Sequence, residues 1–354
     1  MPEPSDTEGI PSPVDVDWTR VDEDYLKKRH RTYLSVLFDS TYWDDWTPRD
    51  TDVIVCTAYK SGTTWMQQIV CQLLFKGEAY PGGKAMHEIS PWLDCRIGEP
   101  REDKMAALEA QTHPRCLKTH LPSDALPIHP QCKYIYVARD GRDAFMSMLN
   151  HWKNTNDETL DVRYEKPGRV GPPMPRWTDI EDIDESKAFD MWLSQGWPSH
   201  PWETDGWPWW SLFTNVESWW HLRGLPNVLF VHFNKLKKDL PGEMRRVAAF
   251  LNIPIDETIF DEQVERCTFE HMKEHAHLFA PAGGRVWEGG AKTFINKGTN
   301  GRWKDVLTPE QVIRYEAKAA TLPPGCAHWL ATGKFIDSED IGRKPLADSL
   351  AIGG

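Results

Sequence analysis

The chain has 354 residues, of which 40% are hydrophobic, and this suits one large α/β domain or two small ones. A net charge of −12 argues against a nucleic acid or an anionic membrane as partner, so a bound anion would need locally concentrated basic residues. Residues 1–18 are acidic and Pro-rich without an apolar core, and no run approaches the roughly 20 apolar residues of a membrane span, so we expect neither a secretory signal nor a membrane-spanning segment.

The first part of the chain is predicted to contain a loose N-terminus, one helix and a strand–loop–helix unit. Residues 1–20 look disordered or loosely attached. Residues 22–38 carry apolar side chains in a charged background, which suits an amphipathic helix. A short apolar run with strand character, followed by apolar residues at helical spacing, spans residues 52–76.

Strands and helices then alternate along the chain. Apolar runs at 133–138 and 228–233 predict buried strands, and helical patterns follow at 144–152 and 242–251. A further helix is expected to begin near Thr308, which is followed by Pro and Glu. This alternation predicts an α/β fold: a central parallel sheet with right-handed crossovers, flanked by helices. We expect one domain over residues 21–335 and a C-terminal tail over 336–354.

Three segments do not fit this alternation. Residues 153–188 are polar, acidic and rich in Pro and Gly, so they are predicted to form a surface excursion that is either a lid or a solvated insertion. Residues 189–220 are rich in Trp, and these side chains could be ordinary core or could line a pocket for an apolar or ring-shaped acceptor. Residues 268–303 look irregular and Gly-rich.

The cysteines and histidines indicate neither a disulfide framework nor a metal site. Seven cysteines are scattered without CxxC pairs, which is typical of reduced thiols in a cytoplasmic protein. Thirteen histidines show no HExxH or similar spacing of metal ligands. We therefore expect a cytoplasmic protein that needs no metal.

The most informative stretch lies in the turn between the first strand and its helix. It reads Lys60, Ser61, Gly62, Thr63, Thr64 and then Trp65. Small and hydroxyl-bearing residues leave backbone N–H groups free to face an anion, and the helix dipole adds to the attraction. The turn therefore predicts a phosphate or sulfate site, with an ordinary βα turn as the alternative. It is not a Walker A sequence, because Lys precedes Ser-Gly.

The end of the second predicted strand and the helix after it carry a second candidate for anion binding. Arg139 lies where the second predicted strand ends, and Ser147 lies two turns into the next helix, so both could grip an oxyanion. The alternative for Arg139 is a salt bridge to Asp140 or Asp143.

Two more segments carry basic residues. Lys118 and His120 place a cation and a potential general base on the same side of an extended segment, although a lone His is more often structural. The stretch from Lys297 to Lys304 is glycine-rich and basic, and its alternative is a plain surface loop.

These four segments together resemble the soluble, cytosolic-type sulfotransferase family that uses 3′-phosphoadenosine 5′-phosphosulfate (PAPS). KSGTTW is similar to the family's 5′-phosphosulfate loop, KTHLP to the segment with its catalytic His, and KGTNGRWK to its C-terminal RKGxxGxWK loop. FTNVESWW and the stretch Cys267–Lys273 resemble two further family segments. The matches keep the family's order and cover roughly residues 30–320. The resemblance implies a nucleotide-binding core that is similar to a P-loop.

The resemblance implies transfer of a sulfuryl group from PAPS to a hydroxyl or amine of a small, apolar or aromatic acceptor, with 3′-phosphoadenosine 5′-phosphate (PAP) as product and no metal. His120 would be the general base, Lys60 would stabilise the leaving oxygen, and Lys118 would stabilise the transferring group. Trp65 would stack on adenine. The implied nucleotide-binding residues are Lys60, Ser61, Gly62, Thr63, Thr64, Trp65, Arg139, Ser147, Phe233, Cys267, Phe269, Asn296, Lys297 and Gly298.

Some positions depart from the family pattern. Tyr59 lies where Pro is usual, Asn296 replaces an Arg, Phe233 replaces a frequent Tyr, and Arg302 replaces an acidic or neutral residue. The family's dimer motif is also incomplete here, so that mode of oligomerisation is in doubt. Two other hypotheses stay open: an ATP-dependent kinase, which would need the missing Walker A loop, and a nucleotide-binding protein without activity.

Overall fold

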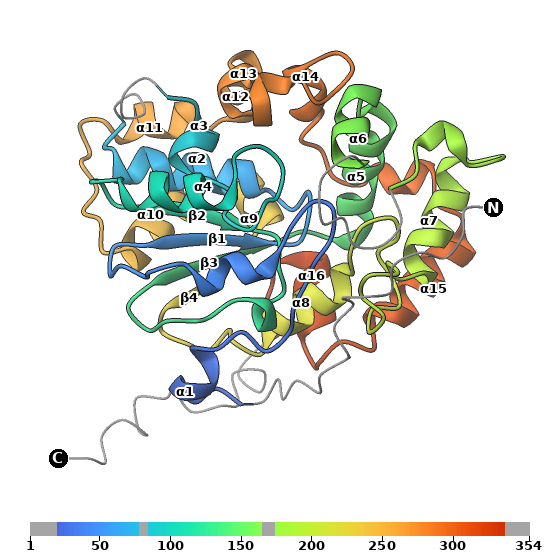
Figure 1. The fold of residues 1–354 in the computed structure, drawn as a ribbon, viewed down its shortest axis with the longest axis horizontal. Coiled ribbons are helices and arrows are strands. Elements are labelled where there is room, and N and C mark those ends of the chain that lie inside the picture. Colours follow the sequence, from blue (N-terminus) through green and yellow to red (C-terminus); the bar gives the residue numbers. More distant parts are fainter. Residues whose placement is uncertain (1–19, 78–83, 165–173, 337–354) are drawn as a thin grey trace.

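The computed structural model describes residues 20–77, 84–164 and 174–336. A parallel sheet lies between two layers of helices, and the strands run through the centre of the molecule (Figure 1). The prediction of a single α/β domain with a central parallel sheet is thus confirmed. Nearly all of the N-terminal segment over 1–20 and the C-terminal tail over 336–354 lie outside the described residues.

The sheet has four strands in the order β2-β1-β3-β4, and every pairing is parallel. The strand predicted at the start of the 52–76 unit and those at 133–138 and 228–233 are confirmed as β1, β3 and β4. β2 was not predicted as a strand, because its run is short and lies at one side of the described sheet. The strands are β1 (Val53–Thr57), β2 (Cys116–Thr119), β3 (Lys133–Ala138) and β4 (Val228–His232).

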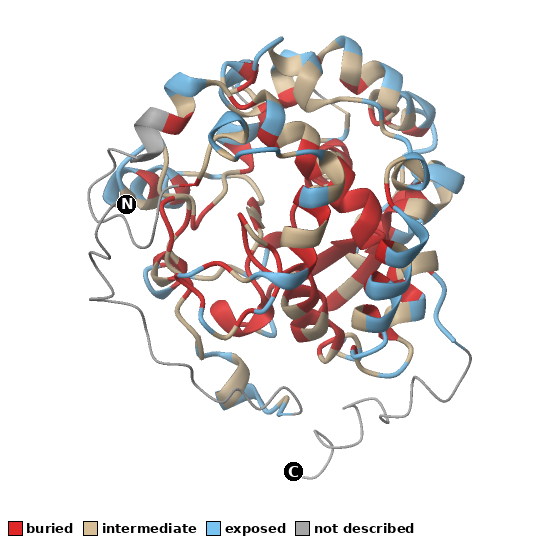
Figure 2. Ribbon diagram, turned by 90° about the vertical axis from the view of Figure 1, so that its right-hand side faces the viewer, coloured by how far each residue is buried: buried red, intermediate tan, exposed pale blue. Residues whose placement is uncertain are grey.

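Alternate residues of each strand belong to two separate apolar clusters, one on each face of the sheet. Val55 and Ile135 belong to one cluster and Ile54 and Tyr134 to the other, as the two-residue period of a strand requires. Buried residues fill the centre of the molecule, and exposed ones lie around it (Figure 2). The first cluster includes α2 (Thr63–Leu74), α10 (Leu240–Phe250) and α11 (Phe260–Arg266), and the second includes α5 (Gly141–Asn154), α8 (Leu212–Trp220) and α16 (Cys326–Thr332).

The remaining helices are mostly short. α15 (Pro309–Ala319) has Thr308 as its N-cap and a reciprocal contact with Gln311, so the predicted helix start is confirmed. The others are α1 (Glu23–Leu26), η1 (Ser40–Asp44), α3 (Met86–Ile89), α4 (Arg101–Glu109), η3 (Ser123–Ala125), α6 (Asp157–Tyr164), η4 (Trp177–Asp179), α7 (Glu185–Ser194), α9 (Phe233–Lys238), α12 (Phe269–Glu274), α13 (Ala276–Phe279), η5 (Pro281–Gly284), α14 (Ala291–Phe294) and η6 (Arg302–Asp305).

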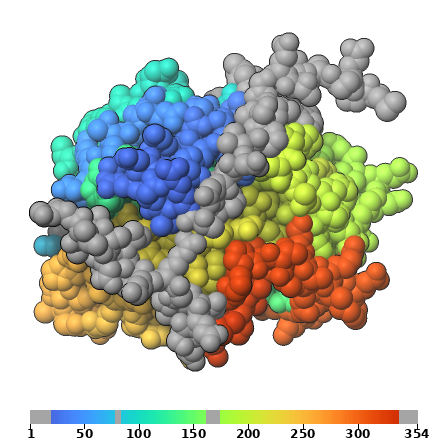
Figure 3. All heavy atoms as spheres, turned by 90° about the horizontal axis from the view of Figure 1, so that it is seen from below, coloured from blue at the N-terminus to red at the C-terminus, as the bar shows by residue number. Residues whose placement is uncertain are grey.

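The predicted helix over 22–38 is wrong beyond its first turn. Only α1 is helical, and hydroxyl side chains hold the rest in turns: Ser40 accepts the N–H of Tyr33, and Ser35 accepts that of Phe38. Such local bonds compete with helical ones. The segment instead lies against residues near 200, where Tyr33 meets Trp202 edge to face (Figure 3).

Two segments predicted to be irregular contain helices. Within 153–188 the structure forms α6 and η4, while 165–173 lies outside the described residues. Within 268–303 it forms α12, α13, η5, α14 and the start of η6. These pieces are too short to show a helical period in the sequence. All seven cysteines are free thiols, and six of them are buried.

A buried ion pair ties the beginnings of β1 and β2 together. The Arg115 Nε donates to Asp52 Oδ1 over 2.7 Å, and both side chains are fully buried. Asp52 also accepts the backbone N–H of Arg49 and the indole N–H of Trp46, so its carboxylate is well satisfied. A buried charge that loses its partner is costly.

We expect Arg115→Met to lower the free energy of unfolding by about 3–5 kcal/mol, because it leaves the Asp52 carboxylate buried without its counter-charge. The double variant Arg115→Met, Asp52→Asn should recover part of this loss, since an amide oxygen still accepts from Trp46 and Arg49. Urea unfolding of the single and double variants measures both effects. A double variant less stable than Arg115→Met would contradict the explanation.

Candidate active site

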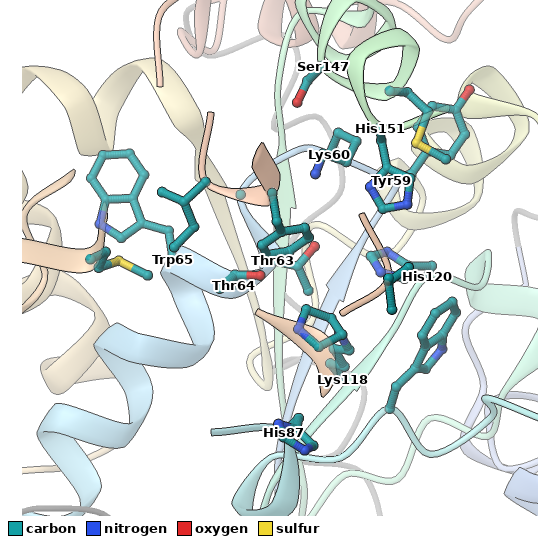
Figure 4. Close-up of a pocket in the computed structure, with 18 of the residues that line it drawn as sticks. Tyr59, Lys60, Thr63, Thr64, Trp65, His87, Lys118, His120, Ser147 and His151 are labelled. Carbon is teal, nitrogen blue, oxygen red and sulfur yellow. The ribbon is translucent and has the colours of Figure 1, made fainter. Parts of the chain in front are cut away.

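The candidate site lies at the carboxyl edge of the sheet. Because β2 and β3 lie on opposite sides of β1, the chain reverses its direction of winding there, and ligands of such sheets bind at that point. Each of the four strands is followed by a residue that lines one cavity of about 1170 Å³: Lys60 after β1, His120 after β2, Arg139 after β3 and Phe233 after β4. Figure 4 shows Lys60, Lys118 and His120 around one space, with Trp65 on the side away from His120.

The loop after β1 has the backbone form of an anion site. Lys60 and Gly62 both have positive φ, 52° and 108°, and α2 begins directly after them. A Cβ at Gly62 would lie 3.1 Å from the Phe233 ring, so the position favours glycine sterically as well as conformationally. No side chain caps this helix start, and its first N–H groups have no acceptor within the helix. The predicted strand–turn–helix unit is therefore present as expected.

Lys60 is held in a weakly solvated position. Its Nζ lies 4.3 Å from the centre of the Phe294 ring. Burial, together with the positive charges of Arg139 and Lys118, lowers the pKa of Lys60 to about 7. An anion placed among these cations would favour the charged form of each.

His120 is oriented through its Nδ1. This atom lies 3.0 Å from Thr57 Oγ1 and 3.3 Å from the Thr57 carbonyl oxygen, which can only accept. The contact favours a hydrogen on Nδ1, so Nε2 is left as the proton acceptor. Burial, and next the charge of Lys118, lowers the pKa of His120 to about 3, so the ring is neutral at physiological pH. The rings of Trp92 and Trp210 flank it at 4.9 and 6.1 Å.

Lys118 reaches the same cavity from within β2. Its Nζ lies 5.4 Å from the Trp92 ring, and burial lowers its pKa. The expectation that Lys118 and His120 share one side is confirmed, since both line the cavity. Two ammonium groups and a neutral imidazole thus meet in one space.

Arg139 does not form the salt bridge that was its alternative interpretation. Asp140 pairs with Arg142 at 2.7 Å, and Asp143 accepts the backbone N–H of Gly301. Arg139 instead donates to the Thr299 carbonyl at 2.8 Å and stacks on Phe233 at 4.3 Å. Burial lowers its pKa to about 10. Its guanidinium therefore has no ion-pair partner among the described residues.

The C-terminal loop closes one side of the cavity. Gly298 has a φ of 61°, and a Cβ there would lie 2.6 Å from the Phe269 ring, so this glycine allows the close approach. The Lys237 ammonium donates to the Gly298 carbonyl at 2.6 Å. Asn296 and Lys297 line the cavity next to it, so the loop is more than a plain surface turn.

Two of the residues expected to bind a nucleotide do not line the cavity. The Ser61 hydroxyl turns back to the Tyr59 carbonyl, at 3.2 Å, and is almost fully buried. Cys267 is buried behind Trp65, and its carbonyl accepts the indole N–H at 2.7 Å. Ser61 therefore stabilises the turn of the loop, and Cys267 holds the Trp65 ring in position. The other residues that were expected at the site line the cavity.

The rest of the wall was missed by sequence reasoning or only partly foreseen. Of the Trp-rich stretch, Trp209 and Trp210 line the cavity, whereas Trp192 is core and donates to the Tyr59 hydroxyl. Thr57, which contacts His120 but does not line the cavity, carried no signal, because its role depends on a partner far along the chain. The unforeseen wall residues are His87, Trp92, Met146, Met148, His151, Met174 and Phe294.

The described residues contain no cluster of three or more His, Cys, Asp or Glu side chains that could hold a metal ion. Within the same residues, no helix combines the length and the apolar character that a membrane crossing needs.

The sequence matches a known family and known enzymes. A family model described as a sulfotransferase domain matches residues 50–319. The glycolipid sulfotransferase of Mycobacterium tuberculosis is 31% identical over 315 residues, which cover 85% of this chain and 94% of that protein. Sulfotransferase 1C2 of Oryctolagus cuniculus is 28% identical over 277 residues, which cover 75% of this chain and 80% of that protein.

Two crystal structures share the fold. Retinol dehydratase, in complex with androsterone and the inactive cofactor PAP, is 22% identical with a TM-score of 0.59, over 80% of this chain and 85% of that one. Mouse sulfotransferase SULT7A1, complexed with PAP, is 20% identical with a TM-score of 0.57, over 88% and 92% of the two chains.

Proposed function

The chain belongs to the sulfotransferase family, and we propose that it transfers the sulfuryl group of PAPS to the hydroxyl or amine of an apolar or aromatic acceptor, with His120 as general base. The observation that carries the assignment is the meeting of Lys60, Lys118 and His120 in one cavity. The loop after β1 borders this space on one side, and Trp and Met side chains border it on the other. A turnover assay with PAPS and a panel of alcohols, phenols and amines tests it.

The donor would lie along the loop after β1. The N-terminus of α2 and Lys60 would hold the 5′-phosphosulfate, and Trp65 would stack on adenine. Arg139 and Ser147 would bind the 3′-phosphate, with Lys297 and Gly298 from the C-terminal loop. The Arg139 guanidinium donates to neutral acceptors and has no ion-pair partner among the described residues, which supports this assignment, since an ion pair within the protein would compete with the phosphate.

The transfer would proceed without a metal. His120 Nε2 removes the proton of the acceptor hydroxyl, whose oxygen forms a bond to sulfur while the bond from sulfur to the 5′-phosphate oxygen breaks. Lys60 hydrogen-bonds the departing oxygen, on which negative charge grows, and Lys118 stabilises the sulfuryl group in flight. The products are a sulfate ester, PAP and the proton held by His120.

The acceptor would lie beside Trp92, Trp209, Trp210 and Met146, which line the cavity. Such a wall favours an apolar or aromatic group near the reacting hydroxyl over a highly charged polysaccharide. The names of two relatives agree with this, since one is a glycolipid sulfotransferase and the other was crystallised with androsterone.

Two further points belong to the same proposal. Met174 brings residues 153–188 to the cavity wall, which supports a role for that segment in covering the acceptor. A cytoplasmic location agrees with the seven free thiols. The dimer motif is incomplete in this stretch, where Ile313 is exposed on α15.

We expect His120→Ala to lower kcat by roughly 10²–10⁴-fold while the affinity for PAP stays nearly unchanged. The imidazole acts on the acceptor, and its loss removes no contact with the nucleotide. Steady-state turnover and calorimetric titration with PAP measure the two quantities. A variant that keeps most of its turnover would make His120 a structural residue.

Arg139→Ala is expected to weaken PAP binding by about ten- to a hundredfold, because a lost charge-assisted contact is worth about 1.5–3 kcal/mol. Ser147→Ala should act in the same direction with a smaller loss, since a neutral hydroxyl contributes less. Calorimetry on both variants tests the assignment. If neither variant changes the affinity, the 3′-phosphate binds elsewhere.

Binding of PAP should take up a proton above pH 7, because the empty site holds Lys60 at a pKa of about 7 and the bound anion favours its charged form. Affinity should therefore fall as the pH rises from 7 through the higher pKa of the complex. Titrations at about pH 8 in two buffers with different heats of ionisation measure the uptake. Lys60→Met is the control and should show none, while buffer-independent heats for the wild type would contradict the prediction.

A further inference from the structure

Arg302 lies at a fixed place on the cavity wall. It begins η6, directly after Gly301, whose φ is 85°. The N–H of Gly301 donates to Asp143 Oδ1 over 2.7 Å, and the Arg142 guanidinium lies 4.0 Å from the Trp303 ring. The residues on both sides of Arg302 are thus anchored to α5, and its side chain lines the cavity.

The same helix α5 carries Ser147, one turn beyond Asp143. Ser147 and Arg139 line the cavity together with Arg302. The wall near the start of α5 therefore combines two guanidinium groups and a hydroxyl.

The charge of this region is not balanced within the protein. Burial is the main cause of the lowered pKa of Arg139, and the positive charge of Arg302 adds to it, so the two guanidinium groups repel one another. In the part of the chain that the structure describes, Arg302 forms no hydrogen bond or ion pair, and Arg139 pairs with no acid. The carboxylates whose charges act on Arg139 are Asp143, which is buried and accepts the Gly301 N–H, and Asp140, which pairs with Arg142.

We propose that Arg302, at a variable position of the C-terminal loop, binds the 3′-phosphate of the nucleotide together with Arg139. This inference rests on the proposed function. A phosphate monoester carries close to two negative charges at neutral pH, which matches two guanidinium groups that have no ion-pair partner among the described residues. Asn296 also lines the cavity, but its side chain is uncharged and cannot pair with a phosphate as an ion. Arg302 can form such an ion pair.

The proposal makes Arg302 responsible for telling 3′-phosphorylated nucleotides from simple ones. Contacts to adenine and to the 5′-phosphate come from Trp65 and the loop after β1, and these stay unchanged when Arg302 is replaced. Loss of Arg302 should therefore weaken PAP and spare adenosine 5′-phosphate.

The test is calorimetric titration of PAP and of adenosine 5′-phosphate into the wild type, Arg302→Ala and Lys304→Ala. Lys304 is a matched control, because it lies in the same η6 and removes the same charge but does not line the cavity. We expect Arg302→Ala to lose affinity for PAP on the order of ten- to a hundredfold, with little change for adenosine 5′-phosphate. Lys304→Ala should change both nucleotides little and equally.

Arg302→Lys is the second variant, and it guards against a folding defect. It keeps the charge but not the two-pronged geometry, so the loss for PAP should be smaller than in Arg302→Ala. Circular dichroism of both variants checks the fold. If the two arginine variants bind PAP as Lys304→Ala does, the role of Arg302 is refuted while the donor assignment stands. If the wild type itself does not prefer PAP, both the donor assignment and this inference fall.

Discussion

The site depends on several positively charged side chains that lie together in one poorly solvated cavity. Burial lowers the pKa values of Lys60, Lys118 and Arg139, and Lys60 also experiences the charges of the other two. An isolated buried charge is unfavourable, and like charges together are more so. The unpaired cations therefore favour an anion strongly, and they do so in a chain whose net charge is −12. Burial, together with the positive charge of Lys118, keeps His120 neutral, which is the form that a general base needs.

The fold supplies the rigidity that such an arrangement requires. Four parallel strands end at one edge, and each delivers a residue to the cavity from a buried backbone. The fully buried pair of Asp52 and Arg115 lies before the starts of β1 and β2, and so holds the opposite edge. Because strands β1 and β2 are tied there, Thr57 and His120 keep their contact at the other end.

Sequence reasoning succeeded where one local feature carries the signal and failed where distant contacts decide. The turn at Lys60, the strands β1, β3 and β4 and the cap at Thr308 were predicted, because each depends on residues within a few positions of one another. The helix expected over 22–38 was wrong, since hydroxyls of Ser35 and Ser40 satisfy its backbone in another way. Six of the eight tryptophans of 189–220 do not line the cavity, and four of these six are buried in the core.

The sequence by itself determined the chemistry available to this protein: a turn of small and hydroxyl-bearing residues before a helix, a Lys and a His two residues apart, and a glycine-rich basic loop. These are properties of short segments, since φ requirements, caps and charges are local. Only the tertiary structure decided which nitrogen of His120 is free, that Arg139 lacks an acidic partner among the described residues, and that Arg302 and Arg139 line the same cavity. Those facts depend on burial and on contacts between residues far apart, such as the 63 positions that separate Thr57 from His120, and no local pattern encodes them.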